Sequence, residues 1–191
     1  MTPEQLFVYT EEVNIHAQLA LSNFVTFQNI VHNHEDRQRR EAWMHLQSFL
    51  SHFGMVSKLL YAPSSRAQVS RERARILRDH LETDSSSALN DRDARNAVEH
   101  LDERMDNWLT QEGKGILESV FPNRRAYDYL SKERWVVRRV YLVEEDIFIT
   151  QESDGPKEMA LQPLAEELSR IISVSNQRLS NDSPYHIIQP S

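Results

Sequence analysis

A long amphipathic pattern at the start of the chain places the strongest constraint on the fold. Apolar side chains recur at helical spacing from Leu6 to Val31, and Thr2-Pro3-Glu4 is a favourable helix start. The stripe consists of Leu6, Val13, Ala17, Ala20, Phe24, Phe27 and Val31. Further apolar positions widen it over much of the circumference: Leu19, Leu21, Val25 and Ile30. Such a helix is expected at the centre of a bundle or in a dimer interface.

Four more segments have the periodicity of amphipathic helices. We expect these helices over residues 37–60, 66–82, 87–111 and 157–178. The 66–82 segment has few apolar positions and several arginines, so we expect it at the edge of the bundle. Because the chain has only 4 glycines and many strong helix formers, composition also favours a mostly helical protein.

A change of character after Pro122 predicts a small β element. Residues 135–143 and 147–150 are rich in β-branched and aromatic side chains, which indicates a β-hairpin over 135–150. Residues 153–156, Ser-Asp-Gly-Pro, form a strong turn signal. The predicted fold is a mostly α, antiparallel bundle of four to five long helices with a hairpin insertion near 135–150. We expect one domain over residues 1–178 and a flexible tail over 179–191.

Composition excludes several classes of protein and of site. The chain contains no cysteine, which excludes disulfides, thiolate nucleophiles and zinc–thiolate sites. No apolar run approaches the ~18 residues that a membrane span needs. Residues 1–5 also lack the basic start of a signal peptide, so we expect a cytoplasmic protein that does not bind membranes. The net charge of −7 argues against a protein that coats nucleic acid without selectivity.

Positive charge is nevertheless concentrated in two islands. The first, over residues 66–78, has Glu72 as its only acid and contains Arg66, Arg71, Arg73, Arg75 and Arg78. The second, over residues 122–141, has Asp128 and Glu133 as acids and contains Arg124, Arg125, Lys132, Arg134, Arg138 and Arg139. Each island is either a local binding surface for a phosphate chain or a solvated face paired with acidic neighbours, and the sequence leaves both interpretations open.

The histidines do not form a convincing metal site. Residues 32–36, His-Asn-His-Glu-Asp, combine two histidines with two acids, but histidines one residue apart in a turn are poorly placed to share an ion. His45 and His52 lie about 10 Å apart along one helix, also too far to share one. We therefore expect local hydrogen bonds for these two histidines, and we predict neither a metal nor a cofactor.

The densest run of charge, residues 90–109, carries the strongest functional signal. Arg95 is followed directly by Asn96 and then, five residues after the arginine, by His100. Apolar residues recur between these polar positions at helical spacing, so the segment can dock on a core while its charges face outward. The Arg-Asn-x-x-x-His pattern resembles the signature of the HEPN superfamily, a group of helical proteins many of which are metal-independent endoribonucleases. The resemblance covers roughly residues 88–109 and implies a HEPN-like bundle.

This resemblance implies a role for each residue of the motif. Cleavage without a metal uses the neighbouring 2′-hydroxyl of RNA as the nucleophile, so the protein must move protons and stabilise charge on the phosphorus centre. Histidine, with an ordinary pKa of about 6.5, suits acid–base work, which the resemblance assigns to His100. Arginine grips two phosphate oxygens at once, and the resemblance assigns phosphate binding to Arg95. Asn96 is assigned the auxiliary role of orienting these groups or the phosphate.

The resemblance also implies a second subunit, and the spacing of the motif agrees with this. Arg95 and His100 are separated by roughly 140° around a helix, so one helix does not bring them to the same phosphate. HEPN nucleases usually pair two subunits across this helix and collect residues from both. We therefore expect a homodimer in which the two 87–111 helices face each other, with RNA as the substrate and a regulatory partner protein as an open possibility.

Two other functions remain open from the sequence. Glu99 and Asp102 flank His100, where they would raise its pKa and repel a phosphate backbone, and Asp102 stands where many HEPN toxins have a tyrosine. These acids favour a non-catalytic protein that uses a HEPN-like bundle for dimerisation and interaction. A nucleotide-binding helical domain is a third option, suggested only by the arginine islands.

Overall fold

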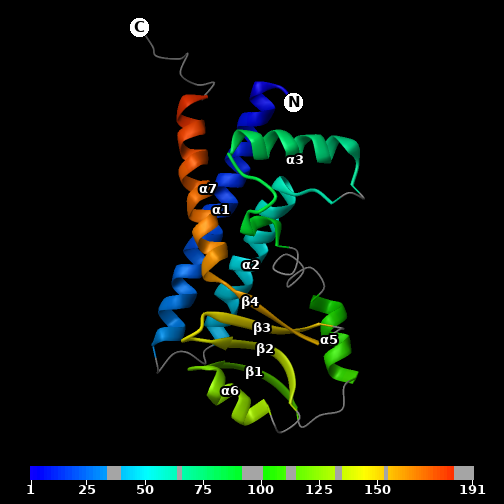
Figure 1. Cartoon of the computed structure of the whole chain (residues 1–191), viewed down its shortest axis with the longest axis vertical. Helices are drawn as coiled ribbons and strands as arrows, with labels where there is room; N and C mark the ends of the chain where they lie inside the picture. Colours follow the sequence, from blue (N-terminus) through cyan, green and yellow to red (C-terminus); the bar gives the residue numbers. More distant parts are fainter. Residues whose placement is uncertain are drawn as a thin grey trace.

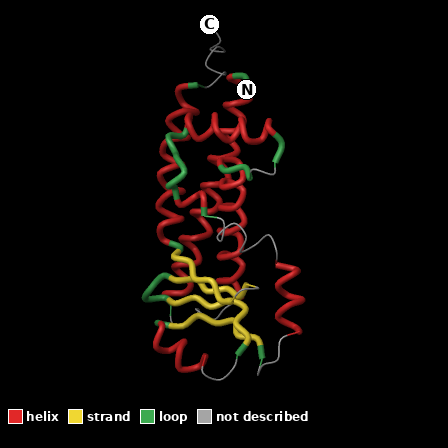
Figure 2. The backbone as a smooth tube through the Cα atoms, turned by 45° about the vertical axis from the view of Figure 1, so that its right-hand side comes forward, coloured by secondary structure: helices red, strands yellow, loops and turns green. Residues whose placement is uncertain are grey.

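The computed structural model describes residues 1–33, 40–63, 66–91, 101–110, 115–131, 135–152 and 155–182. Within these ranges the chain is mostly helical, as predicted, with six α-helices and one small mixed sheet of four strands. The long helices form an elongated body, and the sheet lies at one end of it (Figures 1 and 2). No helix in this part of the chain combines the length and the apolar character needed to cross a membrane.

Two antiparallel helices, α1 (Pro3–His32) and α2 (Arg40–Leu60), are the centre of the fold. α1 begins with a capping box, in which the side chains of Thr2 and Gln5 accept hydrogen bonds from each other's backbone N–H. The stripe predicted from the sequence is buried from Val13 to Val31. The predicted helices over 3–31 and 37–60 are thus confirmed within the described ranges.

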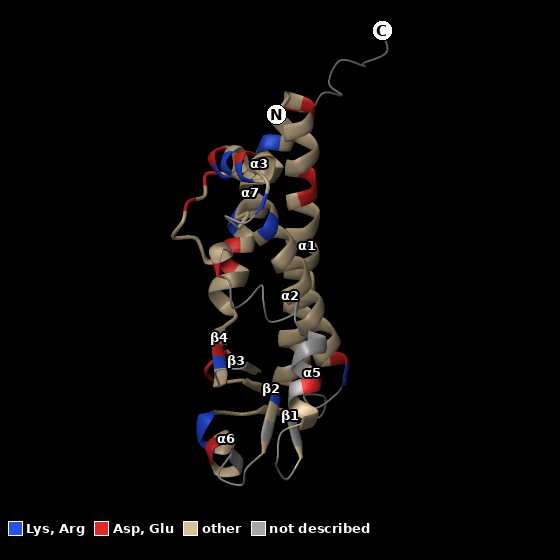
Figure 3. Cartoon of the chain, turned by 90° about the vertical axis from the view of Figure 1, so that its right-hand side faces the viewer, with Lys and Arg blue, Asp and Glu red and all other residues tan. Residues whose placement is uncertain are grey.

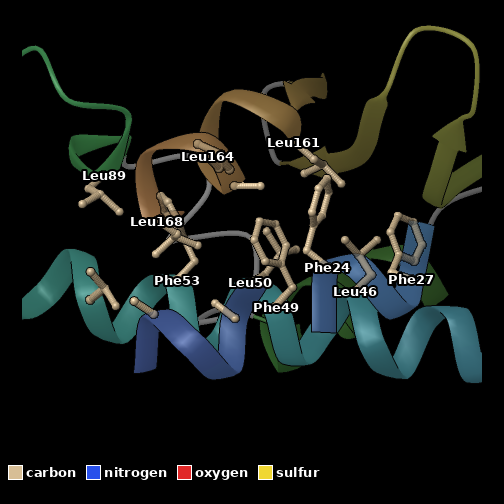
Figure 4. Close-up of a cluster of buried hydrophobic side chains, with 14 of the residues drawn as sticks. Phe24, Phe27, Leu46, Phe49, Leu50, Phe53, Leu89, Leu161, Leu164 and Leu168 are labelled. Atoms are coloured by element: carbon tan, nitrogen blue, oxygen red, sulfur yellow. The ribbon is translucent and has the colours of Figure 1, made fainter. Parts of the chain in front are cut away.

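α7 (Gln162–Asn181) packs along α1 and closes the helical core. Figure 4 shows the residues that meet there from α1, α2 and α7: Phe24, Phe27, Leu46, Phe49, Leu50, Phe53, Leu164 and Leu168. A buried hydrogen bond of 2.7 Å from Asn14 Nδ2 to Ser175 Oγ joins α1 to α7. α3 (Gln68–His80) crosses the end of the bundle near the N-terminus, as its thin apolar stripe predicts (Figure 1).

The sheet is larger than the predicted hairpin. β2 (Val136–Leu142) and β3 (Ile147–Glu152) form the expected antiparallel hairpin. β1 (Ile116–Phe121) adds a strand parallel to β2, and β4 (Gly155–Ala160) adds one antiparallel to β3, in the order β1-β2-β3-β4. A two-stranded hairpin is marginally stable by itself, and the two added strands provide the missing sheet pairing.

β4 also corrects the predicted final helix. That helix was expected from residue 157, but Gly155–Ala160 form a strand and α7 begins at Gln162. β4 is an edge strand, so Pro156 can lie within it without disturbing the sheet. α7 continues to Asn181, so the tail predicted from residue 179 is helical over its first three residues. Residues 183–191 lie outside the described ranges.

The two faces of the sheet pack against different helices. One face contributes Val120, Tyr141, Phe148 and Met159 to the core of the long helices. The opposite face packs with α6 (Arg124–Ser131), where the buried residues are Phe121, Tyr127, Val137, Val140, Leu142 and Ile149. The hairpin predicted as an insertion is therefore part of a layer between the helical bundle and α6 (Figure 1).

Asp146 joins three elements in the turn between β2 and β3. Its Oδ1 accepts a hydrogen bond of 2.8 Å from Gln28 on α1 and another from the hydroxyl of buried Tyr141 on β2. Its Oδ2 accepts the backbone N–H of Gln162 at 2.6 Å and so caps the start of α7. Asp146 adopts φ +51°, a conformation that aspartate tolerates better than most residues.

The continuous helix predicted over residues 87–111 is wrong at its start. Ser87 begins a single 3-10 turn, η1 (Ala88–Asn90), and Asp91 is extended at φ −63° and ψ 113°. The Ser87 hydroxyl donates to Glu167 on α7 at 2.6 Å, and Leu89 is completely buried. Burial of Leu89 and capping by Ser87 override the helical periodicity here. Helical structure is described again from Leu101 to Thr110, as α5.

Candidate functional site

The three residues of the sequence motif lie outside the described part of the chain. Arg95, Asn96 and His100 fall within residues 92–100, so their predicted roles stay predictions. The description stops at extended Asp91 and resumes at Leu101, the first residue of α5. The candidate site is therefore defined by contacts among the described residues.

The first arginine island is used largely for structure. Arg73 and Arg78 donate to the backbone carbonyls of Lys58 and Leu60 at the C-terminal end of α2, and they thereby satisfy groups that a helix end leaves open. Arg75 forms ion pairs of 2.8 Å with Glu72 and with Asp79 on the exposed side of α3. This arrangement fits the interpretation of a solvated, internally paired face.

The second island contains one ion pair at the surface and one cluster in which positive charges outnumber negative charges. Arg124 makes a bidentate pair with Glu158, with distances of 2.7 and 2.6 Å. Lys132 and Arg134 lie outside the described ranges. Arg138 and Arg139 lie together on β2, and with Glu118 of β1 they form what we call the paired-arginine cluster.

A β-bulge creates the paired-arginine cluster. Leu117 pairs with Val137, but Glu118 pairs with Arg139, so Arg138 is an extra residue in β2. In a regular strand adjacent side chains point to opposite faces, whereas both guanidinium groups here reach the same carboxylate. Arg139 Nη2 donates to Glu118 Oε1 at 2.8 Å. Arg138 Nη1 lies 3.1 Å from Glu118 Oε2, an ion-pair distance without hydrogen-bond geometry.

Two tryptophans hold the arginines in place. The guanidinium carbon of Arg139 lies 5.2 Å from the ring centre of Trp43 on α2, and that of Arg138 lies 5.6 Å from the ring centre of Trp108 on α5. Both rings are almost fully buried, so the arginines pack on the edge of the core. The cluster thus connects the sheet to α2 and to α5.

The third tryptophan, Trp135, lies directly before β2. If Gly115 carried a Cβ atom, that atom would lie only 2.8 Å from the Trp135 ring. Gly115 also adopts φ +151°, a conformation that disfavours a side chain. Glycine is therefore required directly before β1.

The paired-arginine cluster carries more positive than negative charge. Two guanidinium groups share one carboxylate, which leaves a formal charge of +1. Burial lowers the pKa of Arg139, the pairing with Glu118 opposes this effect, and the charge of Arg138 adds to it. Arginine stays protonated at neutral pH despite such a shift, so the excess charge persists. The Nε groups of both arginines are buried and have no hydrogen-bond acceptor in the described part of the chain.

This arrangement suits an anion rather than an acid–base reaction. The side chain of Arg138 is 31% exposed and that of Arg139 14% exposed, so a ligand would approach from the Arg138 side. Guanidinium groups present several fixed N–H donors and bind phosphate or carboxylate oxygens well. The only acid in the cluster, Glu118, is already paired with both arginines. The cluster can therefore hold a phosphate, while proton transfer would need other residues.

His45 and His52 lie within hydrogen-bonding distance of polar side chains, but their partners are on α1 and not local as predicted. His45 Nδ1 lies 2.8 Å from Asn23 Oδ1, and His52 Nδ1 lies 2.8 Å from His16 Nδ1. Burial lowers the pKa of His52, and neighbouring His16 lowers it further. His32 bonds the backbone of its own helix, and His34 lies outside the described ranges. Among the described residues, no group of three metal-ligating side chains comes together.

Comparison with protein-family models, curated proteins and solved structures found no match to this chain. The function of this chain is therefore inferred from its own residues. The sequence identified the second arginine island but not Glu118, Trp43 or Trp108. One signal was present: two adjacent arginines inside an apolar strand require a bulge or a buried partner, because one of them would otherwise face the core.

Proposed function

We propose that this chain is a HEPN-like, metal-independent endoribonuclease. The observation that carries the proposal is the position of the motif Arg95-Asn96-x-x-x-His100 directly before α5. α5 in turn packs through Trp108 against Arg138 of a cluster with surplus positive charge. A mostly helical fold is compatible with a HEPN-like bundle, and the four-stranded sheet is an addition to such a bundle.

In the proposed reaction, the 2′-oxygen of one nucleotide attacks the adjacent phosphorus atom. The bond between phosphorus and the 5′-oxygen breaks, leaving a 2′,3′-cyclic phosphate on one product and a 5′-hydroxyl on the other. His100 moves the proton from the 2′-hydroxyl to the departing 5′-oxygen, and Arg95 stabilises the negative charge on the phosphate. Asn96 orients one of these side chains or the phosphate. No metal takes part in this reaction, and no cofactor is needed.

The paired-arginine cluster is proposed to hold a neighbouring phosphate of the same RNA strand. Trp108 lies seven residues beyond Leu101, which is about 10.5 Å of helix rise. That distance corresponds to about three nucleotide steps of a stacked strand at about 3.4 Å each. A phosphate held at Arg138 would fix the strand without taking part in bond cleavage.

Homodimerisation completes this proposal, because Arg95 and His100 need partners that one helix does not supply. Each active cleft would then combine motif residues from two subunits. The break at Asp91 shortens the surface that a continuous 87–111 helix would have offered. The proposed contact between motif segments therefore depends on residues 92–110.

The test is RNA cleavage in the presence of EDTA. Purified protein should cleave total RNA or tRNA and leave 2′,3′-cyclic phosphate ends. Arg95→Ala and His100→Ala should each reduce the rate by about 10²–10⁴-fold, because each removes a group that acts in the transition state. Intact RNA over a broad set of substrates, or full activity in both variants, would refute the proposal.

The paired-arginine cluster is tested through binding rather than rate. Arg138→Ala should weaken RNA binding and lower the salt dependence by about 0.7 in the log–log slope, the value of one single-strand phosphate contact. Arg75→Ala is the matched control, because Arg75 forms surface pairs on α3. If the protein binds RNA without cleaving it, or binds none, the non-catalytic interaction function becomes the better explanation.

A further inference from the structure

The apolar stripe of α3 is only partly used by the core. α3 packs against α2, and its buried residues are Ala74 and Leu77. Two other apolar residues of the predicted stripe stay outside the core: Val69 is 80% exposed, and Ile76 is half-buried. Val69, Arg73 and Ile76 are spaced by four and three residues, so they share one face of α3. This face therefore has a purpose other than filling the core.

A groove separates this face of α3 from the start of the chain and the first turns of α1. Its cavity volume is about 750 Å³, which is within the range of small-molecule sites. We call it the α1–α3 groove. It lies at the end of the bundle that is remote from the sheet (Figure 1). Its lining includes Met1, Val8, Tyr9, Val69 and Ile76 as apolar or aromatic residues, with Arg73 among them.

Arg73 is a half-buried cation without a carboxylate partner in the described part of the chain. Its guanidinium carbon lies 5.3 Å from the ring centre of Tyr9. Its only hydrogen bond to a described residue runs from Nη2 to the backbone carbonyl of Lys58 at 3.3 Å, and its buried Nε has no acceptor there. A guanidinium group has five N–H donors, and a partly buried charge is costly without a counter-charge. A bound anion would remove this cost.

The acids that line the groove are already engaged. Glu72 accepts hydrogen bonds from Arg75 Nη2 at 2.8 Å and Nε at 3.3 Å. Hydrogen bonds from its own backbone N–H and from Thr2 lower the pKa of Glu4, so its carboxylate is held at the start of α1. Figure 3 shows basic and acidic segments next to one another along α3. Among the charged residues of the groove, Arg73 is thus the one that lacks a counter-charge.

We propose that the α1–α3 groove binds a small amphipathic anion with a carboxylate head and an unbranched apolar chain. The carboxylate pairs with Arg73, whose guanidinium group is held against Tyr9. The chain lies along Val8, Val69 and Ile76, which would then be shielded from water. A single negative charge suits the site better than a doubly charged phosphate, because two carboxylates line the same groove. This site is separate from the RNA motif and from the paired-arginine cluster.

The experiment is isothermal titration calorimetry of the full chain at neutral pH, with decanoate as the probe below the concentration at which it forms micelles. We expect binding at one site. Affinity should fall about twofold to fourfold for each methylene removed between decanoate and hexanoate, because each buried methylene contributes to binding. Decan-1-ol has the same chain without the charge and should bind at least about tenfold more weakly.

Two substitutions test the two parts of the site. Arg73→Met should weaken decanoate binding about 10–100-fold and change decan-1-ol binding much less, since it removes only the charge. Arg71→Met is the matched control, because Arg71 is an exposed arginine of α3 that donates to the carbonyl of Arg66 at 2.9 Å and does not line the groove. This control should bind decanoate like the wild type.

If circular dichroism shows that Arg73→Met is unfolded, Val69→Glu decides the question, because the exposure of Val69 makes a loss of folding unlikely to follow from this change. The new carboxylate in the groove should weaken decanoate binding at least about tenfold. Leu109→Glu, on the exposed side of α5, should have no effect.

Several outcomes would overturn the proposal. Absence of decanoate binding by the wild type would do so, and so would equal decanoate affinity in the wild type and a folded Arg73→Met variant. Tighter binding of decyltrimethylammonium than of decanoate would assign the groove to a cation held by Glu4 and Glu72. None of these measurements involves RNA, so this proposal and the proposed ribonuclease function fail separately.

Discussion

Glu118→Gln is the most direct test of the charge imbalance in the paired-arginine cluster. The substitution keeps the shape of the side chain but removes the only negative charge shared by Arg138 and Arg139. Breaking a fully buried ion pair costs about 3–5 kcal/mol, and the partial exposure of this cluster reduces that figure to about 2–3 kcal/mol. For a chain of this length, the expected fall in Tm is about 5–10 °C.

The same variant should regain stability when an anion is added. Phosphate can occupy the position next to the two guanidinium groups that the carboxylate no longer neutralises. With a dissociation constant of about 1 mM, 20 mM phosphate would restore about 1.8 kcal/mol. Differential scanning fluorimetry in phosphate and in chloride of equal ionic strength measures both effects.

The control is Glu158→Gln, which breaks the surface pair with Arg124 and should cost less than about 1 kcal/mol without recovery in phosphate. Two results would refute the reasoning. One is a Glu118→Gln protein as stable as the wild type. The other is an equal effect of phosphate on Glu118→Gln, Glu158→Gln and the wild type, which would mean that the anion acts on the whole protein.

Three further predictions concern the fold. Gly115→Ala should lower the free energy of unfolding by about 1–3 kcal/mol in urea titrations, because the new methyl group meets the Trp135 ring. Asp146→Ala should cost about 2–4 kcal/mol in the same assay, since it removes the acceptor that joins three elements. Burial lowers the pKa of His52 and of His80 in the folded protein, so the unfolded chain binds these two protons at a higher pH than the folded chain does. The free energy of unfolding should therefore fall as the pH drops below 6.5. Replacing both histidines with glutamine should flatten this part of the pH profile, whereas an unchanged profile would assign it to other groups.

The helical part of the fold was largely predictable because its signal is local. The apolar stripe of α1 runs from Leu6 to Val31, about seven turns, and no competing pattern occurs in the same residues. The edge strands were missed for the opposite reason. In β4, Met159 and the adjoining Leu161 fit either a strand or the first turn of a helix, and the choice depends on pairing with β3. Pro163 near the start of α7 was the one local sign that the helix begins later.

The candidate site was less predictable because it depends on contacts between distant segments. Glu118 and Arg139 are separated by 21 positions in the sequence, and a bulge brings Arg138 to the same carboxylate. The sequence shows where the arginines are, but it does not show which of them must share one carboxylate. The error at Ser87–Asp91 has a similar cause, since the contacts of Leu89 and Ser87 with other helices decide the local backbone.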